Sequence, residues 1–89
     1  MLSPVYLNAF KKDVKLAKKR GLDTEALKLV LTLIVEEKPL PDKLRNHKLS
    51  GNWNGHWECH ISPDWLLIYR IGKGDAIFER TGSHADLFG

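Results

Sequence analysis

An α+β fold, with two N-terminal helices packed on one face of an antiparallel β-sheet, is the architecture that the sequence predicts. Apolar residues recur at helical spacing over residues 1–41, whereas from residue 57 onward they alternate with polar residues or form short β-rich runs. Glycines and prolines stand between these segments, where turns are expected. A chain of 89 residues suits one folding unit, so we expect a single domain over residues 1–89.

The first 21 residues are predicted to form a short strand at residues 5–7 and then a helix. Gly21 is well placed to end this helix, because glycine readily adopts the left-handed conformation that follows a helix C-terminus. Four apolar residues, three or four positions apart, mark the buried face of the helix: Leu7, Phe10, Val14 and Ala17.

A second helix is predicted to begin after Asp23, whose carboxylate can cap the free N–H groups of the first turn. Leu22 and Leu27 stand at the two positions of a hydrophobic staple. Pro39 and Pro41 end the helix, since proline cannot continue its hydrogen bonding. The two helices are therefore expected to form an antiparallel pair.

The second half of the chain is predicted to form consecutive antiparallel strands joined by tight turns. Residues 62–64 and 72–75 have turn composition. Residues 65–71 are apolar on both faces, which indicates a central strand. The three main strands are expected at 57–61, 65–71 and 76–81. A further short strand is expected within 46–53, and Ser83 is placed to cap a last helical turn.

The charge distribution permits a polyanionic partner. The net charge is +3 and the pI is about 9.1, which is only mildly basic. The positive charge is concentrated in the first helix, where Asp13 is the one acidic residue among Lys11, Lys12, Lys15, Lys18, Lys19 and Arg20. This pattern fits either a solvated helix face or a phosphate-binding face.

Cysteine usage and hydropathy favour the cytoplasm. Cys59 is the only cysteine, which excludes an internal disulfide and argues against a zinc cluster. The N-terminal residues lack the apolar core and cleavage site of a signal peptide. No apolar run approaches the roughly 20 residues needed to span a membrane. We therefore expect a cytoplasmic protein with no membrane partner.

Polar residues of catalytic type gather in the second half, and no phosphate-binding loop or metal-ligand motif is present. Four of them fall at strand ends or turns of the predicted sheet: His60, Asp64, Arg80 and His84. The end of the first main strand and the end of the third lie at the same sheet edge, because successive antiparallel strands reverse direction. These four residues can therefore converge, and His47 and His56 complete the set of histidines.

Such a set suits RNA cleavage. The 2′-hydroxyl of RNA must lose a proton to attack the adjacent phosphate, and the 5′-oxygen must gain one as it leaves. Histidine exchanges protons near neutral pH, and the arginine fork matches phosphate oxygens. RNA supplies its own nucleophile, so neither a metal nor any other cofactor is required.

Structural explanations exist for the same residues. A single surface histidine often has no function, and Asp64 is typical of a residue that stabilises a turn. The alternative to a catalytic role for Arg80 is a purely structural one, as the ion-pair partner of Glu79 or Glu58. The three tryptophans, Trp53, Trp57 and Trp65, favour core or rim positions over base stacking.

Four segments resemble YafQ-type toxins, and the order and spacing of three separate segments agree with that family. Residues 60–69, HISPDWLLIY, and residues 78–89, FERTGSHADLFG, are similar to the family signature. Upstream, residues 47–53, HKLSGNW, resemble the family's H-x-L-x-G-x-W segment, and residues 13–20, DVKLAKKR, resemble its basic first helix. The resemblance covers nearly the whole chain and places it among the RelE-like toxins, whose fold is similar to that of microbial ribonucleases.

The resemblance implies an mRNA interferase of a type II toxin–antitoxin system, which cuts mRNA in the ribosomal A site and is inhibited by a cognate antitoxin. It implies catalytic roles for His47, His60, Asp64, Arg80, His84 and Phe88. His84 would be the leading acid–base residue, Arg80 the transition-state stabiliser, and Asp64 a group that orients a histidine. RNA and ribosome contacts are expected from Lys11, Lys12, Lys15, Lys18, Lys19 and Trp65.

Two other functions are compatible with this fold. ParE-like toxins share it and inhibit DNA gyrase by binding, without cutting RNA, and a toxin relative that has lost activity could act as a regulator. The histidine set favours the nuclease, because a gyrase binder does not need it. For the antitoxin, the basic pI predicts an acidic segment that folds on binding over the first helix.

Overall fold

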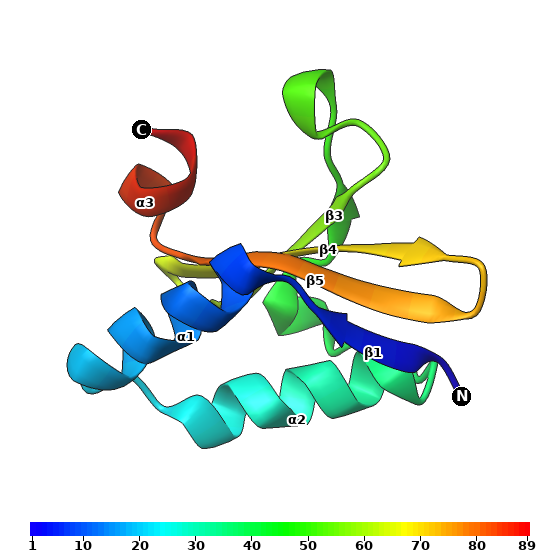
Figure 1. Cartoon of the computed structure of the whole chain (residues 1–89), viewed down its shortest axis with the longest axis horizontal. Coiled ribbons are helices and arrows are strands. Elements are labelled where there is room, and N and C mark those ends of the chain that lie inside the picture. The colour runs from blue at the N-terminus through cyan, green and yellow to red at the C-terminus, as the bar shows by residue number, and fades with distance from the viewer.

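A five-stranded sheet with the order β1-β5-β4-β3-β2 forms the centre of the computed structural model, which describes residues 1–89 (Figure 1). The strands are β1 (Ser3–Tyr6), β2 (His47–Lys48), β3 (Trp57–Ser62), β4 (Trp65–Gly72) and β5 (Asp75–Gly82). The helices are α1 (Asn8–Lys19), α2 (Thr24–Val35) and α3 (His84–Phe88), with 3-10 turns η1 (Asp42–Leu44) and η2 (Gly51–Trp53).

Local sequence signals account for the element boundaries. The Asp23 carboxylate accepts hydrogen bonds from the backbone N–H groups of Glu25 and Ala26, so it is the N-cap of α2, as predicted. Gly21, which follows α1, has a φ of 76°, in the left-handed region. Ser83 and Asp86 form a reciprocal capping box at the start of α3. The three predicted main strands are confirmed to within one residue at each end.

The direction of β1 differs from the expectation of a fully antiparallel sheet. β1 pairs in parallel with β5, with Ser3 opposite Asp75 and Tyr6 opposite Phe78, so the sheet is mixed. The other neighbouring strands pair in antiparallel fashion. The reason is topological: α1 and α2 carry the chain away from β1 before the antiparallel strands form, and β1 is left to pair at the free edge of β5. Local patterning carries no information about such a pairing.

β4 is the central strand, and its two faces support two separate cores. Its odd-numbered residues, Trp65, Leu67 and Tyr69, belong to the main core together with residues of α1 and α2. Its even-numbered residues, Leu66 and Ile68, belong to a smaller core on the other face. That face, here called the open face, is covered only in part, by Leu87 of α3 and by Leu49 and Trp53.

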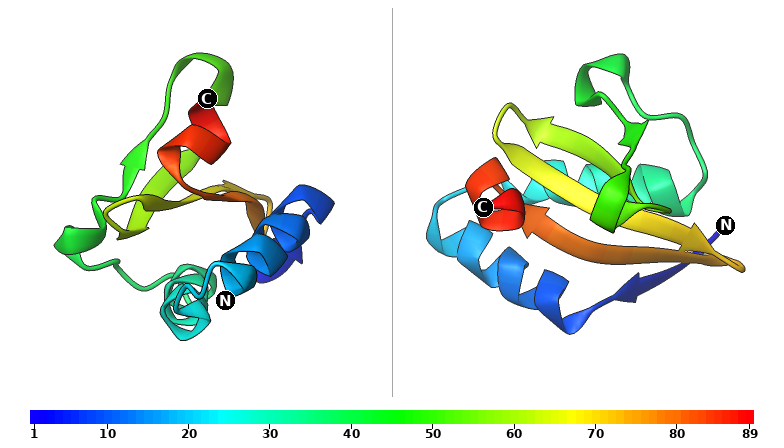
Figure 2. Two further views of the ribbon diagram at one scale, coloured as in Figure 1. Left: turned by 90° about the vertical axis from the view of Figure 1, so that its left-hand side faces the viewer. Right: turned by 90° about the horizontal axis from the view of Figure 1, so that it is seen from above.

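The two long helices occupy different positions relative to the sheet. α2 lies beneath it, whereas α1 continues directly from β1 and runs along the C-terminal half of β5 (Figures 1 and 2). α3 and the η2 segment lie on the face of the sheet opposite α2 (Figure 1). None of the helices combines the length and the apolar character needed to cross a membrane.

Asp13 of α1 closes the edge of β5 that β1 leaves uncovered. β1 reaches only as far as Phe78, whose carbonyl accepts a hydrogen bond from the Leu7 N–H at 3.3 Å. Beyond that point, Asp13 accepts from the Thr81 backbone N–H at 3.1 Å. The same carboxylate accepts from Nε and Nη2 of Arg80 at 2.6 and 3.2 Å. These hydrogen bonds raise the pKa of Arg80.

We predict that Asp13→Ala destabilises the protein, because it leaves the Thr81 N–H without a partner and Arg80 without its counter-charge. The expected loss is about 2 kcal/mol, which corresponds to a fall in Tm of roughly 8–16 °C for a domain of this size. Thermal unfolding followed by circular dichroism measures it. Glu25→Gln, an exposed charge change that breaks no side-chain hydrogen bond, is the control. A Tm loss no larger than that of the control would contradict this role of Asp13.

Candidate active site

Histidines from three separate elements meet on the open face of the sheet. His47 lies on β2 opposite Glu58 of β3, and His60 lies two residues further along β3. Glu58 and His60 pair with Ile68 and Leu66 of β4, which places them on the same face as those residues. His84, the first residue of α3, completes the cluster.

The ring-to-ring distances show that these histidines form a continuous row. The ring centroids of His47 and His60 are 6.2 Å apart, and those of His60 and His84 are 5.8 Å apart. Of the four residues that the strand order predicted to converge (His60, Asp64, Arg80 and His84), His60 and His84 therefore lie side by side. His56 is outside this row, because its Nε2 lies 3.2 Å from Glu79 and its ring packs edge-on against Trp53.

Asp64 holds His84 by two contacts to one carboxylate oxygen. Oδ1 of Asp64 lies 2.7 Å from Nδ1 of His84 and accepts the His84 backbone N–H at 3.0 Å. The backbone hydrogen bond, and then the side-chain one, lower the pKa of Asp64. Since a carboxylate can only accept, Nδ1 carries the hydrogen and Nε2 remains available for proton transfer. Both side chains are exposed, at 55% for His84 and 68% for Asp64.

Glu58 is a buried carboxylate between two of the histidines, and it was missed as a site residue. Its Oε1 lies 3.4 Å from Nε2 of His47 and 3.4 Å from Nε2 of His60, and its side chain is only 7% exposed. The Nδ1 of His47 faces the Arg45 carbonyl oxygen at 2.6 Å and therefore also carries a hydrogen. The period of a strand already places His56, Glu58 and His60 on one face, which is the sequence signal that points to this cluster.

Arg80 reaches the open face through an irregularity in β5. Ile68 pairs with Arg80 and Tyr69 pairs with Phe78, so Glu79 is the extra residue of a β-bulge. The interpretation of Arg80 as a partner of Glu79 or Glu58 is wrong, because its carboxylate partner is Asp13.

Glu79 has partners of its own beside this bulge, namely Nε of Arg70 at 2.8 Å and Nε2 of His56 at 3.2 Å. Although burial acts to raise the pKa of Glu79, the hydrogen bonds from Arg70 and His56 outweigh it, and the pKa is lowered. This second polar cluster is therefore separate from the histidine row.

The two aromatic residues assigned to the site differ in position. Phe88 is 47% exposed at the end of α3, where it can meet a substrate. Trp65 is only 4% exposed and belongs to the main core on the face of the sheet opposite the histidines. The assignment of Trp65 as an RNA contact therefore needs correction: odd-numbered residues of β4 point toward the helices, so this ring offers no surface to RNA.

Two ion pairs attach the lysine-rich helix α1 to the site. Asp13 binds Arg80, and the guanidinium of Arg20, the residue directly after α1, binds the carboxylate of Asp86 in α3 at 2.6 Å. The Arg20 hydrogen bond, followed by that from the Ser83 N–H, lowers the pKa of Asp86 well below its usual range. The five lysines of α1 assigned to RNA are all exposed: Lys11, Lys12, Lys15, Lys18 and Lys19.

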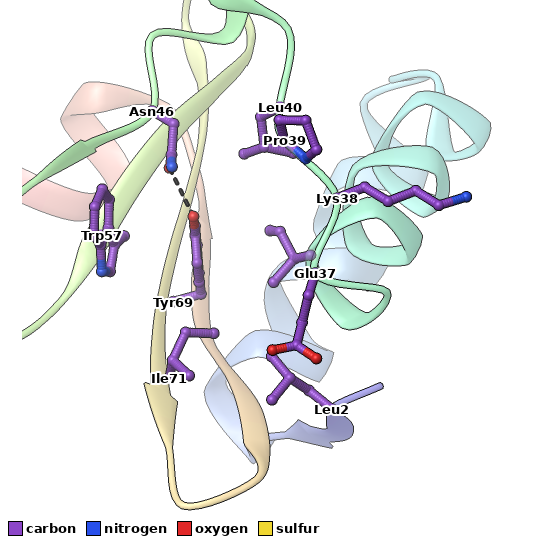
Figure 3. Close-up of a pocket in the computed structure, with 10 residues that line it drawn as sticks. Leu2, Glu37, Lys38, Pro39, Leu40, Asn46, Trp57, Tyr69 and Ile71 are labelled. Carbon is purple, nitrogen blue, oxygen red and sulfur yellow. Dashed lines mark hydrogen bonds between the residues drawn. The ribbon is translucent and has the colours of Figure 1, made fainter.

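A cavity of about 720 Å³ opens beside the histidine row, and both His60 and His84 line it. A second hollow, of about 280 Å³, lies on the other side of the sheet, between β4 and the segment after α2 (Figure 3). There the hydroxyl of Tyr69 donates to Asn46 at 2.7 Å, and burial raises the pKa of Tyr69 to about 12. This second hollow contains none of the histidines.

The side chains favour neither a cysteine nucleophile nor a metal-binding cluster. Cys59 is buried, and burial, followed by the nearby charge of Glu58, raises the pKa of its thiol to about 12, which makes it a poor nucleophile at neutral pH. No three histidine, cysteine or acidic side chains are arranged to hold a metal ion. The histidine row with Asp64 and Arg80 is thus the group of residues best arranged for chemistry.

Comparison with known proteins identifies the family. Residues 2–89 match the family model described as a bacterial toxin of type II toxin–antitoxin systems, YafQ. The chain is 46% identical over 85 residues to the mRNA interferase toxin YafQ of Escherichia coli (strain K12), covering 94% of this chain and 92% of that protein.

Comparison with solved structures leads to the same family. The crystal structure of YafQ from Escherichia coli strain BL21(DE3) matches with a TM-score of 0.95 and 42% identity over 100% of both chains. YafQ in the Escherichia coli DinJ-YafQ toxin-antitoxin complex matches with a TM-score of 0.92 and 44% identity, covering 99% of this chain and 98% of that one. The resemblance of the sequence motifs and the RelE-like fold are both confirmed, and the chain belongs to the YafQ family of bacterial toxins of type II toxin–antitoxin systems.

Proposed function

We propose that this toxin is an endoribonuclease, an mRNA interferase, which cuts mRNA in the ribosomal A site by metal-independent acid–base catalysis. The observation that carries the proposal is the exposed His84–Asp64 pair beside His60, on a face that also presents Arg80. The name of the Escherichia coli relative, an mRNA interferase toxin, supports the substrate class.

The proposed reaction requires two proton transfers. A basic group removes the proton from the 2′-hydroxyl, whose oxygen then attacks the adjacent phosphorus. The P–O5′ bond breaks, the departing oxygen takes a proton from an acidic group, and a 2′,3′-cyclic phosphate remains on the upstream fragment. His84 exchanges its proton at Nε2, because Asp64 holds Nδ1. The row of rings places His60 and His47 next to it as proton-transfer or phosphate-contact groups.

Glu58 positions two histidines of the row. Its Oε1 lies 3.4 Å from Nε2 of His47 and 3.4 Å from Nε2 of His60, while Nδ1 of His47 faces the Arg45 carbonyl oxygen. The carboxylate itself is buried, so it anchors both rings from beneath the exposed part of the site. The two rings are thereby held where an RNA phosphate would bind.

Arg80 is arranged to hold a second partner in addition to Asp13. The ion pair occupies Nε and one hydrogen of Nη2, while Nη1 makes no hydrogen bond within the protein. These remaining donors can bind the phosphate oxygens that gain charge in the transition state. Phe88, exposed at the end of α3, completes the proposed site as a surface for a base.

The other proposed functions receive less support. A gyrase-binding toxin of the ParE type needs no row of histidines held by carboxylates, and the match of residues 2–89 is to the YafQ model. A regulator without activity would have no need for an aligned His84–Asp64 pair.

For inhibition, we propose an antitoxin whose acidic segment covers α1 and blocks docking to the ribosome. The Escherichia coli relative has been solved in a complex with its antitoxin DinJ. On this toxin, the exposed lysines of α1 are the densest positive surface and the strongest electrostatic target for an acidic chain. The cytoplasm, where mRNA and ribosomes are found, is the proposed site of action.

Replacing His84 tests the catalytic assignment. We expect His84→Ala to lower the rate of RNA cleavage about 10²–10⁴-fold, the usual effect of removing a positioned acid or base. Tm should change little, since the side chain is exposed. The matched control is His56→Ala, which removes a histidine outside the row. A folded His84→Ala protein that cleaves at a near-normal rate would rule out this role.

Arg80→Lys separates phosphate attraction from transition-state stabilisation. A single ammonium group cannot bind Asp13 through two nitrogens and also present further donors to a phosphate, so we expect cleavage to fall about 10²-fold or more. Arg80→Ala, assayed in parallel, gives the full loss. Wild-type activity in the lysine variant would show that Arg80 contributes only a general positive charge.

Neutralising the α1 lysines tests ribosome docking. Changing Lys11, Lys15 and Lys18 to glutamine should weaken ribosome binding and flatten its dependence on salt, because fewer counterions are released. The pattern of cut sites should stay the same, since backbone contacts carry no sequence information. Neutralising Lys28 and Lys73, which are also exposed, is the control. An altered codon preference with an unchanged salt dependence would contradict the docking role.

A further inference from the structure

The cavity of about 720 Å³ beside the histidine row has a wall that the proposed catalytic residues do not explain. His60 and His84 form one side of it, and the β3–β4 turn contributes Ser62 and Pro63. The remaining wall is the segment 43–45, with Lys43 and Arg45 as its charged residues. Its volume is typical of ligand sites, and no carboxylate lines it.

Arg45 is the only arginine of the chain without a salt bridge. Arg20, Arg70 and Arg80 are all paired with carboxylates, whereas neither Arg45 nor Lys43 has a carboxylate within salt-bridge distance. Both side chains are exposed. The two cations therefore bring uncompensated positive charge to the cavity.

The backbone at Arg45 is held in a conformation that arginine rarely adopts. Its φ and ψ are 49° and 47°, in the left-handed region that favours glycine or asparagine. The conformation is fixed from three sides: the Arg45 N–H donates to the Asp42 carbonyl at 3.0 Å, the Arg45 carbonyl accepts from Nδ1 of His47 at 2.6 Å, and Leu44 is buried in the main core. The position of Arg45 is thus tied directly to the histidine row.

The segment 43–45 and helix α1 lie toward opposite lateral edges of the sheet, as the left view of Figure 2 shows. α1 runs along β5, whereas η1 packs against β3, two strands away in the sheet order. His60 and His84 line the cavity next to segment 43–45, and α1 is tied to α3, which carries His84, by the Arg20–Asp86 pair. A nucleic-acid strand that crosses the open face would meet positive charge on both sides of the cleavage site.

We propose that Arg45 and Lys43 form a phosphate-binding subsite for the RNA backbone, next to the scissile phosphate and on the side away from α1. The inference rests on the proposed ribonuclease function, since it assigns the RNA strand to this cavity. The planar fork of Arg45 suits a phosphodiester oxygen pair, and Lys43 adds a mobile positive charge. Backbone contacts of this kind hold the strand in register and do not read its sequence.

Binding of a 2′-O-methylated RNA oligonucleotide, which lacks the nucleophile and cannot be cut by this reaction, tests the subsite. We expect Arg45→Asn to raise the Kd several-fold at low salt and to reduce the slope of log K against log salt by about 0.7, the value for one phosphate contact on a single strand. Lys43→Gln should act in the same direction. Lys73→Gln, the same loss of one charge on the β4–β5 turn, should match the wild type.

Asparagine is chosen because it tolerates the left-handed conformation, so Arg45→Asn should keep or raise the Tm while it weakens RNA binding. An unchanged Kd and an unchanged salt slope in a folded Arg45→Asn protein would overturn the subsite. If the variant instead weakens binding of the antitoxin and leaves RNA binding intact, the cavity belongs to an acidic protein segment, and the RNA proposal is wrong.

Different experimental results would refute the ribonuclease function and the phosphate-binding subsite. A wild-type toxin that binds the modified RNA with an Arg45-dependent salt slope, but cuts no unmodified RNA, would refute the ribonuclease function and leave the phosphate contact standing. A toxin whose cleavage depends on His84, with an Arg45→Asn variant identical to the wild type in RNA affinity, would refute only the subsite.

Discussion

One carboxylate, that of Asp13, joins the helical part of the protein to the strand that carries Arg80. It accepts the Thr81 N–H at the point where β1 has ended and β5 would otherwise present an open edge. It also orients Arg80 through two nitrogens of the guanidinium. Because a buried N–H and a cationic side chain share this acceptor, the position of α1, the closure of the sheet and the direction of Arg80 depend on one another.

A second carboxylate, that of Glu58, organises the other side of the site. Carboxylates are seldom buried to this extent without a polar partner, and here Nε2 of His47 and Nε2 of His60 each lie 3.4 Å from Oε1 of Glu58. The arrangement is possible because the open face carries only a small apolar core around Leu66 and Ile68. The main core on the opposite face supports the fold, and the open face is left available for the polar side chains of the candidate site.

The site residues come from short or terminal elements, yet each is held by a defined contact. β2 has two residues and α3 has five, too few for either to be stable alone. His47 is held through the Arg45 carbonyl, His84 through Asp64, and α3 through its capping box and the Arg20–Asp86 pair. Gly82 lets α3 fold back closely, since a Cβ there would lie 3.0 Å from the Cβ of Asp86. Preorganisation thus comes from side-chain contacts between elements.

The local amino-acid sequence determined the helices, their caps and the three antiparallel strands. It also determined the turn that brings Asp64 toward His84, because each of these features depends on neighbours within a few residues. The histidines were also accessible from the sequence, through strand alternation and family motifs. Tertiary structure alone decided the parallel pairing of β1, the partnership of Asp13 with Arg80 across 67 residues, and the burial of Trp65 away from the site. It also decided that Glu58 lies between two histidines and that Arg45 faces the cavity. These features arise from contacts between elements distant in sequence, and hydrophobic periodicity shows which face a residue occupies but not which partner it meets there.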